Sequence, residues 1–351
     1  MNLLDKLAEF NNANMQLGGY NSKVLLIDGN NLYIRSYCAS STLGDEGNHV
    51  GGITGFMFSL AATIRMHHPS RVVVIFDGSG GSLRRRELFP DYKKDRHSTV
   101  RLNRTYEFTD TEEEKNKGWQ LQVLVGMLKC LPLLTIAPDH IEADDAIAYL
   151  AKIVEERENG KAIILSMDKD FLQLVNENIS VWSPIKKVMY RPDKVVEDYG
   201  FHPNNFLLYR AITGDKSDNI PGIDGIKEKT LIKHFPDLAL SGAKDVGFIF
   251  EEAQRQAAEK KKAPVVLTTL LANREIIERN IKLMRLDEPM ISGTSKMEVL
   301  KQFDMPLPKF DKMTLTKIIN QHKFASAFTN WDNWLQTSFV PLNRFLLGEM
   351  K

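Results

Sequence analysis

Nine carboxylates occur in six short blocks of this chain, and nearly all of them border an apolar run. If folding brings these carboxylates to one place, their mutual repulsion must be offset by cations. Holding divalent metal ions against a phosphate is the chemistry that best explains such a cluster. The pattern therefore predicts a metal-dependent nuclease. The nine residues are Asp28, Asp77, Glu142, Asp144, Asp145, Asp168, Asp170, Asp215 and Asp218.

Three of these acids, Asp28, Asp77 and Asp168, follow segments with the composition of buried strands. Continuous apolar runs with helical segments between them are typical of a parallel sheet covered on both faces. The carboxyl ends of such strands meet at one edge of the sheet, where open α/β folds bind their ligands. The sequence thus predicts an α/β fold that gathers these acids. The expected strands are 23–27, 71–76 and 161–166, and the expected crossover helices are 53–66, 119–130 and 144–156.

Two of the acidic blocks also have ordinary structural interpretations. Glu142, Asp144 and Asp145 open an expected helix, where acids commonly cap backbone N–H groups and complement the helix dipole. Three acids within four residues exceed what a cap requires, so an active-site role is favoured. Asp168 and Asp170 would point to the same side of an extended segment. Alone, these two residues fit a loop pair equally well.

Residues 83–118 interrupt the alternation of strands and helices. Basic residues in this segment are interleaved with Phe89, Tyr92 and Tyr106. Phosphate-neutralising charge mixed with stacking surfaces is typical of binding to single-stranded nucleic acid. A solvated surface loop is the alternative, although long insertions in compact domains are usually functional or disordered. The basic residues are Arg84, Arg85, Arg86, Lys93, Lys94, Arg96, Arg101 and Arg104.

The segment Gly222-Ile223-Asp224-Gly225-Ile226 has the spacing of a helix–hairpin–helix turn. Such a turn presents backbone N–H groups that bind phosphate without reading base sequence. Lys227 and Lys229 add positive charge beside it. A single hairpin of this kind is a weak indicator of DNA binding. Its position directly after Asp215 and Asp218 makes it a strong one.

Composition and charge agree with a nucleic-acid enzyme. The 351 residues are 43% hydrophobic and 26% charged, which is ordinary for a soluble globular protein of one to three domains. The chain has 46 Lys and Arg against 45 Asp and Glu. Setting aside the nine clustered acids leaves 36 acids and an excess of ten positive charges, as expected for a nucleic-acid-binding surface.

The sequence contains no signal for a membrane or an oxidising compartment. No run of about 18 apolar residues is present, so no membrane span is expected. Residues 1–20 lack the basic start and the apolar run of a secretory signal. Cys38 and Cys130 form no closely spaced pair, which argues for the reducing cytoplasm and against a zinc site.

The order of these blocks resembles the 5′ nuclease superfamily, which includes flap endonucleases, the 5′-nuclease domain of bacterial DNA polymerase I, and phage 5′ exonucleases and ribonuclease H. The resemblance extends from about Lys23 to His234, and together the motifs are highly specific. Its size suggests a stand-alone enzyme of the phage type. The matching blocks are Ile-Asp-Gly-Asn-Asn from 27, Phe-Asp-Gly from 76, Tyr92-Lys93-x-x-Arg96, Glu142-Ala-Asp-Asp, Asp168-Lys-Asp, and Gly-Asp-x-x-Asp-Asn-Ile-Pro-Gly-Ile from 214.

The resemblance implies roles for individual residues. Tyr92, Lys93 and Arg96 would lie on the family's arch; Lys93, or its neighbour Lys94, would stabilise the phosphate that is cleaved, with help from Arg96. Arg84, Arg85 and Arg86 would steer the substrate. The first metal ion would be held by Asp28, Asp77, Glu142 and Asp144, with Asp145 in support. The second metal ion would be surrounded by Asp168, Asp170, Asp215 and Asp218.

Two segments depart from the family pattern. Lys227 occupies a position that is usually glycine in the hairpin, which leaves the turn geometry and a K⁺ site there open. Residues 1–22 extend past the usual start and have no assigned role. The expected fold is a PIN-like α/β nuclease core with a mostly parallel sheet. Its expected divisions are an N-terminal extension (1–22), the nuclease core (23–183) with an arch insertion (83–118), a helix–hairpin–helix DNA-binding subdomain (184–242) and a helical C-terminal region (243–351).

The resulting prediction is a structure-specific 5′ nuclease, with both 5′-3′ exonuclease and flap endonuclease activity, that uses two Mg²⁺ ions, for which Mn²⁺ can substitute. Its expected substrates are DNA and RNA/DNA duplexes with 5′ flaps or ends, and its expected role is removal of RNA primers and flaps during DNA replication. A single-stranded DNA-binding protein is a candidate partner of the C-terminal region, by family analogy. A cytoplasmic monomer is expected, in the host cytoplasm if the protein is phage-encoded.

Two other functions are compatible with parts of the pattern. A non-catalytic protein that binds DNA junctions could use the same fold, but it would be expected to lack some of the acids. A toxin-type ribonuclease would be shorter and would have no hairpin motif. A dinucleotide-binding dehydrogenase is disfavoured because no Gly-x-Gly-x-x-Gly follows the first expected strand.

Overall fold

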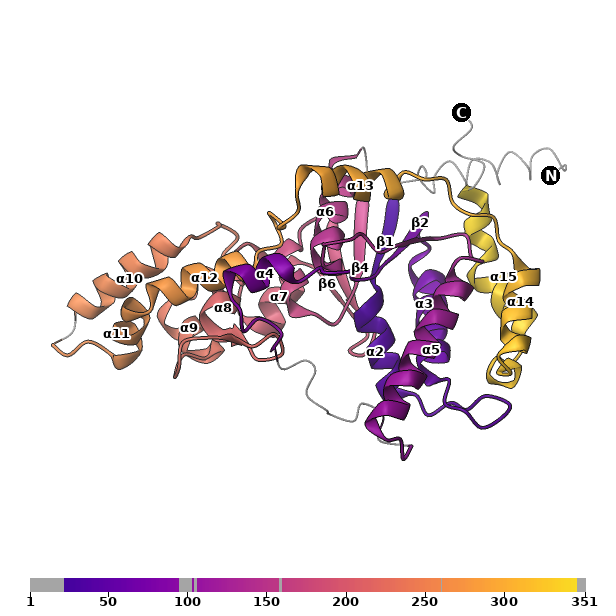
Figure 1. Cartoon of the computed structure of the whole chain (residues 1–351). Helices are drawn as coiled ribbons and strands as arrows, with labels where there is room; N and C mark the ends of the chain where they lie inside the picture. Colours follow the sequence, from indigo (N-terminus) through magenta and orange to yellow (C-terminus); the bar gives the residue numbers. More distant parts are fainter. Residues whose placement is uncertain (1–21, 95–102, 104–105, 158–159, 260, 346–351) are drawn as a thin grey trace, which may run out of the picture.

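A six-stranded sheet forms the centre of the larger lobe (Figure 1). The structure, a computed structural model, describes residues 22–94, 103, 106–157, 160–259 and 261–345. The strand order is β3-β2-β1-β4-β5-β6, and every neighbouring pair is parallel except β5 and β6. The strands are β1 (Lys23–Asp28), β2 (Arg71–Ile75), β3 (Leu134–Ile136), β4 (Lys161–Leu165), β5 (Ile179–Ser183) and β6 (Val188–Tyr190).

The three predicted strands are confirmed as β1, β2 and β4, at the centre of this sheet. Successive side chains of a strand point to opposite faces. In β1, Val24 and Leu26 therefore pack into one core, whereas Leu25 and Ile27 pack into the other, and all four are fully buried. Burial on both faces is the reason that these strands have continuous apolar sequences. The predicted α/β fold is confirmed.

Helices cover both faces of the sheet (Figure 1). One core joins the sheet to α2, α3, α5, α14 and α15, and the other joins it to α6 and α13. The helices predicted over 53–66 and 144–156 are confirmed as α3 and α6. The bounds are α2 (Gly29–Ala39), α3 (Gly51–His67), α4 (Leu83–Leu88), α5 (Asp110–Leu128), α6 (Ala143–Glu156), α13 (Gly293–Phe303), α14 (Lys312–Gln321) and α15 (Trp331–Ser338), with 3-10 turns η2 (Lys169–Leu174), η4 (Ala325–Ala327) and η5 (Val340–Phe345).

The helix predicted from residue 119 begins earlier, at Asp110. Its first turn is closed by a capping box in which Thr109 accepts from the Glu112 backbone N–H and the Glu112 side chain accepts from the Thr109 backbone. The acids of this turn suit the positive end of the helix dipole. The apolar stripe that reveals a helix in sequence starts only beyond these polar turns, so the prediction placed the start too late.

A second, helical lobe extends away from the sheet (Figure 1). Within it α8 packs against α12 and against η2, which follows β4. The same apolar core runs from α6 into this lobe, so the two lobes share one packed interior. The elements are α7 (Pro192–Tyr199), α8 (Pro203–Thr213), the two-stranded ribbon β7 (Gly214–Asp215) and β8 (Ile220–Pro221), α9 (Glu228–His234), η3 (Pro236–Ala239), α10 (Val246–Ala258), α11 (Val265–Ala272) and α12 (Arg274–Met284).

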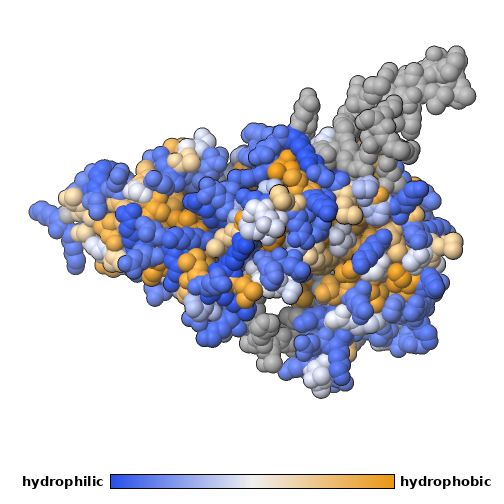
Figure 2. Space-filling view, turned by 45° about the horizontal axis from the view of Figure 1, so that its top comes forward, coloured by the Kyte–Doolittle hydropathy of each residue, from blue (hydrophilic) through white to orange (hydrophobic). Residues whose placement is uncertain are grey.

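Hydrophilic residues cover most of the face drawn in Figure 2, with smaller apolar patches between them. Among the described residues, no helix combines the length and the apolar character that crossing a bilayer requires.

Candidate active site

Four of the predicted carboxylates line one cavity of about 720 Å³ at the carboxyl edge of the sheet: Asp28, Asp77, Asp144 and Asp168. Asp28 is the last residue of β1, Asp77 follows β2, and Asp168 lies between β4 and η2. Asp144 lies in the first turn of α6. The parallel strands therefore deliver three acids to one edge, as the topology requires, and a helix start adds the fourth.

Backbone and hydroxyl groups hold three of these four carboxylates in place. Asp28 caps α2 by accepting from the Asn31 N–H at 3.0 Å, and its other oxygen accepts from the Ser166 hydroxyl at 3.0 Å. Asp77 accepts from the N–H of Ala143 at 2.8 Å and from the side chain of Asn30. These contacts orient the side chains without neutralising them.

Asp168 and Asp144 complete the set in different ways. Asp168 accepts from the Asp170 N–H at 2.8 Å and caps η2. Asp144 makes no hydrogen bond or ion pair with any residue that the structure describes, and it lines the cavity. Its carboxylate is thus the one of the four with the greatest freedom to accept a ligand.

The electrostatic state of this cavity favours cations. Burial, followed by the neighbouring charges of Asp168 and Asp77, raises the pKa of Asp28 to about 7. Burial and the charges of Asp28 and Asp168 raise the pKa of Asp144 well above its ordinary value. Each raised pKa means that the carboxylate would gain free energy from a nearby positive charge.

Arg85 is buried beside two of the acids. Its guanidinium donates to both oxygens of Asp145, at 2.6 and 2.8 Å, and to Glu142 at 2.5 Å. Only 4% of the residue is exposed. The structure therefore does not place Arg85 on the surface, where we expected it to steer substrate, because two buried carboxylates require a buried cation. Asp145 faces Arg85 and is absent from the lining of the acidic cavity.

The other two arginines of this run are placed differently. The Arg84 guanidinium donates to the Met290 carbonyl at 2.8 Å, and the exposed Arg86 lines a smaller cavity that it shares with Asp77, Lys93 and Glu142. Arg86 is thus the one of the three that is both exposed and adjacent to the acids.

Tyr92 and Lys93 bring the predicted arch segment into the site. The Lys93 ammonium donates to Glu142 at 2.6 Å and lies 3.9 Å from Asp218. The Tyr92 hydroxyl donates to Glu142 at 3.0 Å. Burial alone would raise the pKa of Glu142, but Lys93 and Arg85 outweigh it and lower that pKa. Lys94 is exposed and pairs with Asp91, so only Lys93 faces the acids; Arg96 lies outside the described residues.

Sequence reasoning missed Arg210, the third buried cation that pairs with the predicted acids. Its guanidinium donates to Asp170 at 2.6 Å and also to Asp215. Burial, with the charge of Asp168 adding to it, outweighs the effect of Arg210 and raises the pKa of Asp170 to about 7. The available signal was a single charge within the apolar run of α8, four residues before Gly214. A charge inside such a run is costly unless an acid pairs with it.

The hairpin residues lie after β8, in a cavity of about 540 Å³ that is separate from the acidic one. Gly222 has no room for a side chain, since a Cβ would lie 2.3 Å from the Thr213 carbonyl, and Gly225 has a φ of +80°. Lys227 has a φ of −119° and precedes α9, so a lysine fits there without backbone strain. The exposed side chains of Lys227 and Lys229 lie on the surface of this turn.

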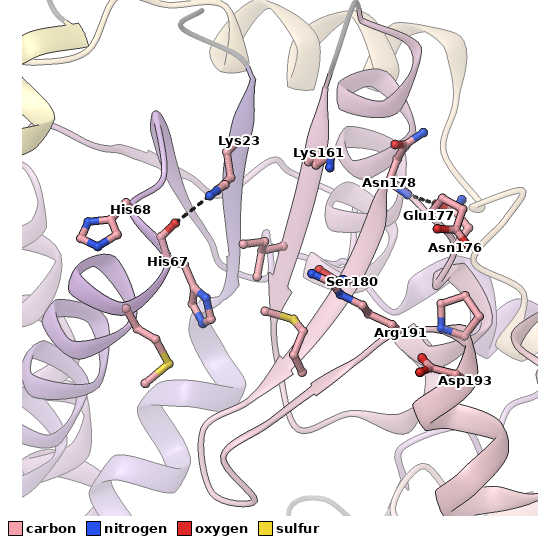
Figure 3. A pocket seen from close by; sticks show the side chains of 14 residues that line it. Lys23, His67, His68, Lys161, Asn176, Glu177, Asn178, Ser180, Arg191 and Asp193 are labelled. Atoms are coloured by element: carbon pink, nitrogen blue, oxygen red, sulfur yellow. Dashed lines mark hydrogen bonds between the residues drawn. The ribbon is translucent and has the colours of Figure 1, made fainter. Parts of the chain in front are cut away.

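A further cavity, of about 610 Å³, opens at the opposite, amino end of β1 and β4 (Figure 3). Lys23 and Lys161 line it together with His67, and the Lys23 ammonium donates to the His67 carbonyl at 3.2 Å. Only two acids, Glu177 and Asp193, reach it. This cavity therefore lacks the set of four carboxylates found at the carboxyl edge of the sheet.

The donor set of the acidic cavity fits a hard divalent cation, because its carboxylates supply only oxygen ligands. Among the residues that the structure describes, no group of three or more His, Cys, Asp or Glu side chains is arranged so that it could hold a metal ion. The four cavity carboxylates would therefore have to move closer together to bind one, and the charge of a cation would favour that approach.

The fold and the acidic edge of its sheet define a nuclease of the 5′ nuclease superfamily, and the comparisons with known proteins agree. The model for the N-terminal resolvase-like domain of 5′-3′ exonucleases matches residues 23–200. A 5′-3′ exonuclease of Aquifex aeolicus (strain VF5) is 31% identical over 271 residues, with 75% of this chain and 87% of that protein covered. This chain belongs to the 5′-3′ exonuclease family.

Other relatives are longer or more distant. The thermostable DNA polymerase I of Thermus filiformis is 36% identical over 211 residues, covering 60% of this chain but only 23% of that protein. A bacteriophage T5 flap endonuclease, solved with DNA and metal ions, superposes with a TM-score of 0.59 at 19% identity. That match covers 85% of this chain and 98% of the other. At this identity the match shows a shared fold.

We predict that Asp144→Asn raises the melting temperature in EDTA by a few degrees at pH 8, because it removes one of several repelling charges. When Mg²⁺ or Mn²⁺ is added, the melting temperature of the same variant should rise by less than that of the wild type. Differential scanning fluorimetry measures both effects. Glu177→Gln, at the cavity of Figure 3, is the control and should behave as wild type. An unchanged metal response in Asp144→Asn would contradict the assignment.

We predict that Arg85→Met destabilises the fold by about 3–5 kcal/mol, because it leaves Glu142 and Asp145 buried without their shared cation. Urea unfolding measures this loss. Arg84→Met is the matched control and should cost about 1 kcal/mol or less, since that residue makes one partly buried contact. Equal losses in the two variants would contradict a special role for Arg85.

Proposed function

We propose that this protein is a structure-specific 5′ nuclease that hydrolyses phosphodiesters at 5′ flaps and 5′ ends, leaving 5′-phosphate and 3′-hydroxyl products. The observation that carries the proposal is the cavity lined by Asp28, Asp77, Asp144, Asp168 and Lys93. Carboxylates that need cations, beside a lysine that can bind phosphate, are the parts that metal-dependent phosphodiester hydrolysis requires. Membership of the 5′-3′ exonuclease family supports the same activity.

The proposed cofactor is a pair of Mg²⁺ ions, for which Mn²⁺ can substitute. Asp28, Asp77, Glu142 and Asp144 are the predicted ligands of the first ion. Asp28, Asp77 and Asp144 line the acidic cavity together with Asp168, whereas Glu142 pairs with Arg85 and Lys93 beside it. Divalent ions in such a site generate a nucleophile from water at neutral pH and offset the charge of the phosphate and leaving group. The predicted second set is Asp168, Asp170, Asp215 and Asp218, and there Arg210 would share Asp170 and Asp215 with the ion.

Lys93 would bind the phosphate that is cleaved. Its ammonium already lies among the acids, with Glu142 as its nearest acceptor at 2.6 Å. A phosphate oxygen entering the cavity would offer the Lys93 ammonium a second anionic acceptor besides Glu142. The Tyr92 ring, 4.9 Å from the Lys93 nitrogen, would limit where that ammonium can move. Arg96 would assist from the arch.

The substrate would be held on both sides of the acidic cavity. Arg86 is exposed beside the acids, and Lys94 lies on the outer side of the same segment. The backbone N–H groups of the hairpin, with Lys227 and Lys229, would bind duplex phosphates without base specificity. A K⁺ ion at the hairpin is part of the same proposal.

We also propose the cellular role expected from the sequence, which is removal of RNA primers and flaps during DNA replication, on DNA and RNA/DNA duplexes. The similarity to DNA polymerase I supports this role. The free thiols of Cys38 and Cys130 suit the cytoplasm, and a monomer that contacts a single-stranded DNA-binding protein completes the proposal. The alternative, a non-catalytic junction-binding protein, is not favoured, since all nine acids are retained.

The experiment that tests the function is product sizing on a 5′-flap duplex labelled separately at each end of the flap strand, in Mg²⁺ and in EDTA. We expect a cut near the junction, only with Mg²⁺. Short 5′ products would indicate that exonuclease action dominates at the same site. Tight binding without cleavage in Mg²⁺ or Mn²⁺ would contradict the proposal and support the junction-binding alternative.

We predict that Lys93→Ala lowers the single-turnover cleavage rate by roughly 100-fold or more, because a donor to the reacting phosphate is lost. Binding of the flap duplex, measured by fluorescence anisotropy in Ca²⁺, should change by less than about fivefold. Lys94→Ala is the adjacent control, and its cleavage rate should stay close to wild type. If Lys94→Ala lowers the cleavage rate more than Lys93→Ala does, then Lys94, and not Lys93, binds the phosphate that is cleaved.

A further inference from the structure

We infer that residues 280–286, the end of α12 and the two residues after it, fix the relative positions of the acid-bearing segments. Gln173 and Asn280 are then positioning residues of the active site. This inference rests on the proposed function. It assigns a role in the active site to a part of the C-terminal region, for which the sequence predicted only a candidate protein partner. The inference depends on four contacts, made by Arg85, Gln173, Asn280 and Tyr92.

The first contact uses a carbonyl that the helix leaves free. The last carbonyls of a helix have no partner within it, and they form the negative end of its dipole. The Leu283 carbonyl, in the last turn of α12, accepts from Arg85 Nε at 2.8 Å. Arg85 is the cation that holds Glu142 and Asp145. The end of α12 therefore sets the position and favours the charge of that cation.

The second contact is made by Gln173, from η2. Its amide nitrogen donates to the Met284 carbonyl at 2.9 Å and to the Asp170 carbonyl at 2.8 Å. Its amide oxygen accepts from the Leu286 N–H at 2.9 Å. One side chain thus ties the backbone of Asp170 to the end of α12, and it uses a donor and an acceptor that only an amide provides.

The third contact is made by Asn280, which is completely buried. Its amide nitrogen donates to the carbonyls of Ala211 and Pro221, each at 2.8 Å. Ala211 lies in the last turn of α8, and Pro221 ends the ribbon that begins with Gly214 and Asp215. Asn280 therefore holds both ends of the turn that carries Asp215 and Asp218.

The fourth contact is apolar. Leu283 and Met284 pack with Tyr92 and Ile220 in a small buried cluster that is separate from the two main cores. Tyr92 precedes Lys93, and Ile220 follows Asp218 by two residues. Segment 280–286 thus contacts the neighbours of the lysine as well as those of the acids. No two of these acid-bearing segments could shift independently while all four contacts persist.

The test is Gln173→Glu, which keeps size and shape but removes the donor, so that an oxygen faces the carbonyls of Asp170 and Met284. Gln173 is only half-buried, so the variant can fold. We expect the Mn²⁺ concentration that gives half of the metal-induced rise in melting temperature to increase roughly tenfold or more, without DNA present. We expect the single-turnover rate on the flap duplex to fall about 10- to 100-fold. Gln173→Met should show the same two effects.

Asn205→Asp is the matched control. Asn205 is also completely buried, and its amide nitrogen donates to the carbonyls of Leu238, Leu240 and Gly242, none of which adjoins an acid of the site. We expect this variant to lower the melting temperature without moving the Mn²⁺ midpoint. Asn280→Asp should lower the melting temperature and raise the midpoint as well.

Three outcomes separate the possibilities. If both Gln173 variants keep the wild-type Mn²⁺ midpoint and cleavage rate, the positioning role is overturned while the nuclease function stands. The role is also overturned if Asn205→Asp raises the midpoint as much as Gln173→Glu does, because the effect would then follow stability alone. If wild-type protein binds the flap duplex but does not cleave it, the proposed function fails; the midpoint shift still tests the positioning.

Discussion

Mutual repulsion among buried carboxylates is the constraint on which the rest of this structure depends. The parallel sheet brings Asp28, Asp77 and Asp168 to one edge, and α6 adds Asp144 to the same cavity. Such a cluster can be folded only if cations accompany it or if protons neutralise it. The protein supplies three cations from two parts of the chain: Arg85 and Lys93 from α4 and the turn after it, and Arg210 from α8. These cations satisfy the outer acids and leave the four cavity carboxylates for ligands from outside the chain.

The cations divide the acids by role. Arg85 forms ion pairs with Asp145 and Glu142, and its Nε donates to the Leu283 carbonyl at the end of α12. Arg210 occupies Asp170 and Asp215 within the second lobe. Lys93 pairs with Glu142 and lies 3.9 Å from Asp218.

Much of this arrangement could be predicted from the sequence, for reasons that are local. Buried parallel strands have continuous apolar sequences, and an acid directly after such a run lies at the carboxyl edge, as Asp28 does. Arg85 was beyond such reasoning, because a basic residue in a basic run is ordinarily exposed and only tertiary contacts bury it. Arg210 left one signal, its charge within the apolar run of α8, but the sequence did not show which acids it would pair with. The contribution of α12 was hidden for the same reason, since backbone carbonyls that accept from Arg85 and Gln173 have no signature in sequence.

The proposed function depends on divalent cations binding in the acidic cavity. A crystal structure of the protein grown with Mn²⁺, with the anomalous signal used to locate the ions, would test this binding. We expect an anomalous peak within bonding distance of carboxylate oxygens of Asp28, Asp77, Asp144 and Asp168. Clear density for these side chains with no peak among them, or with peaks only elsewhere, such as the cavity of Figure 3, would contradict it.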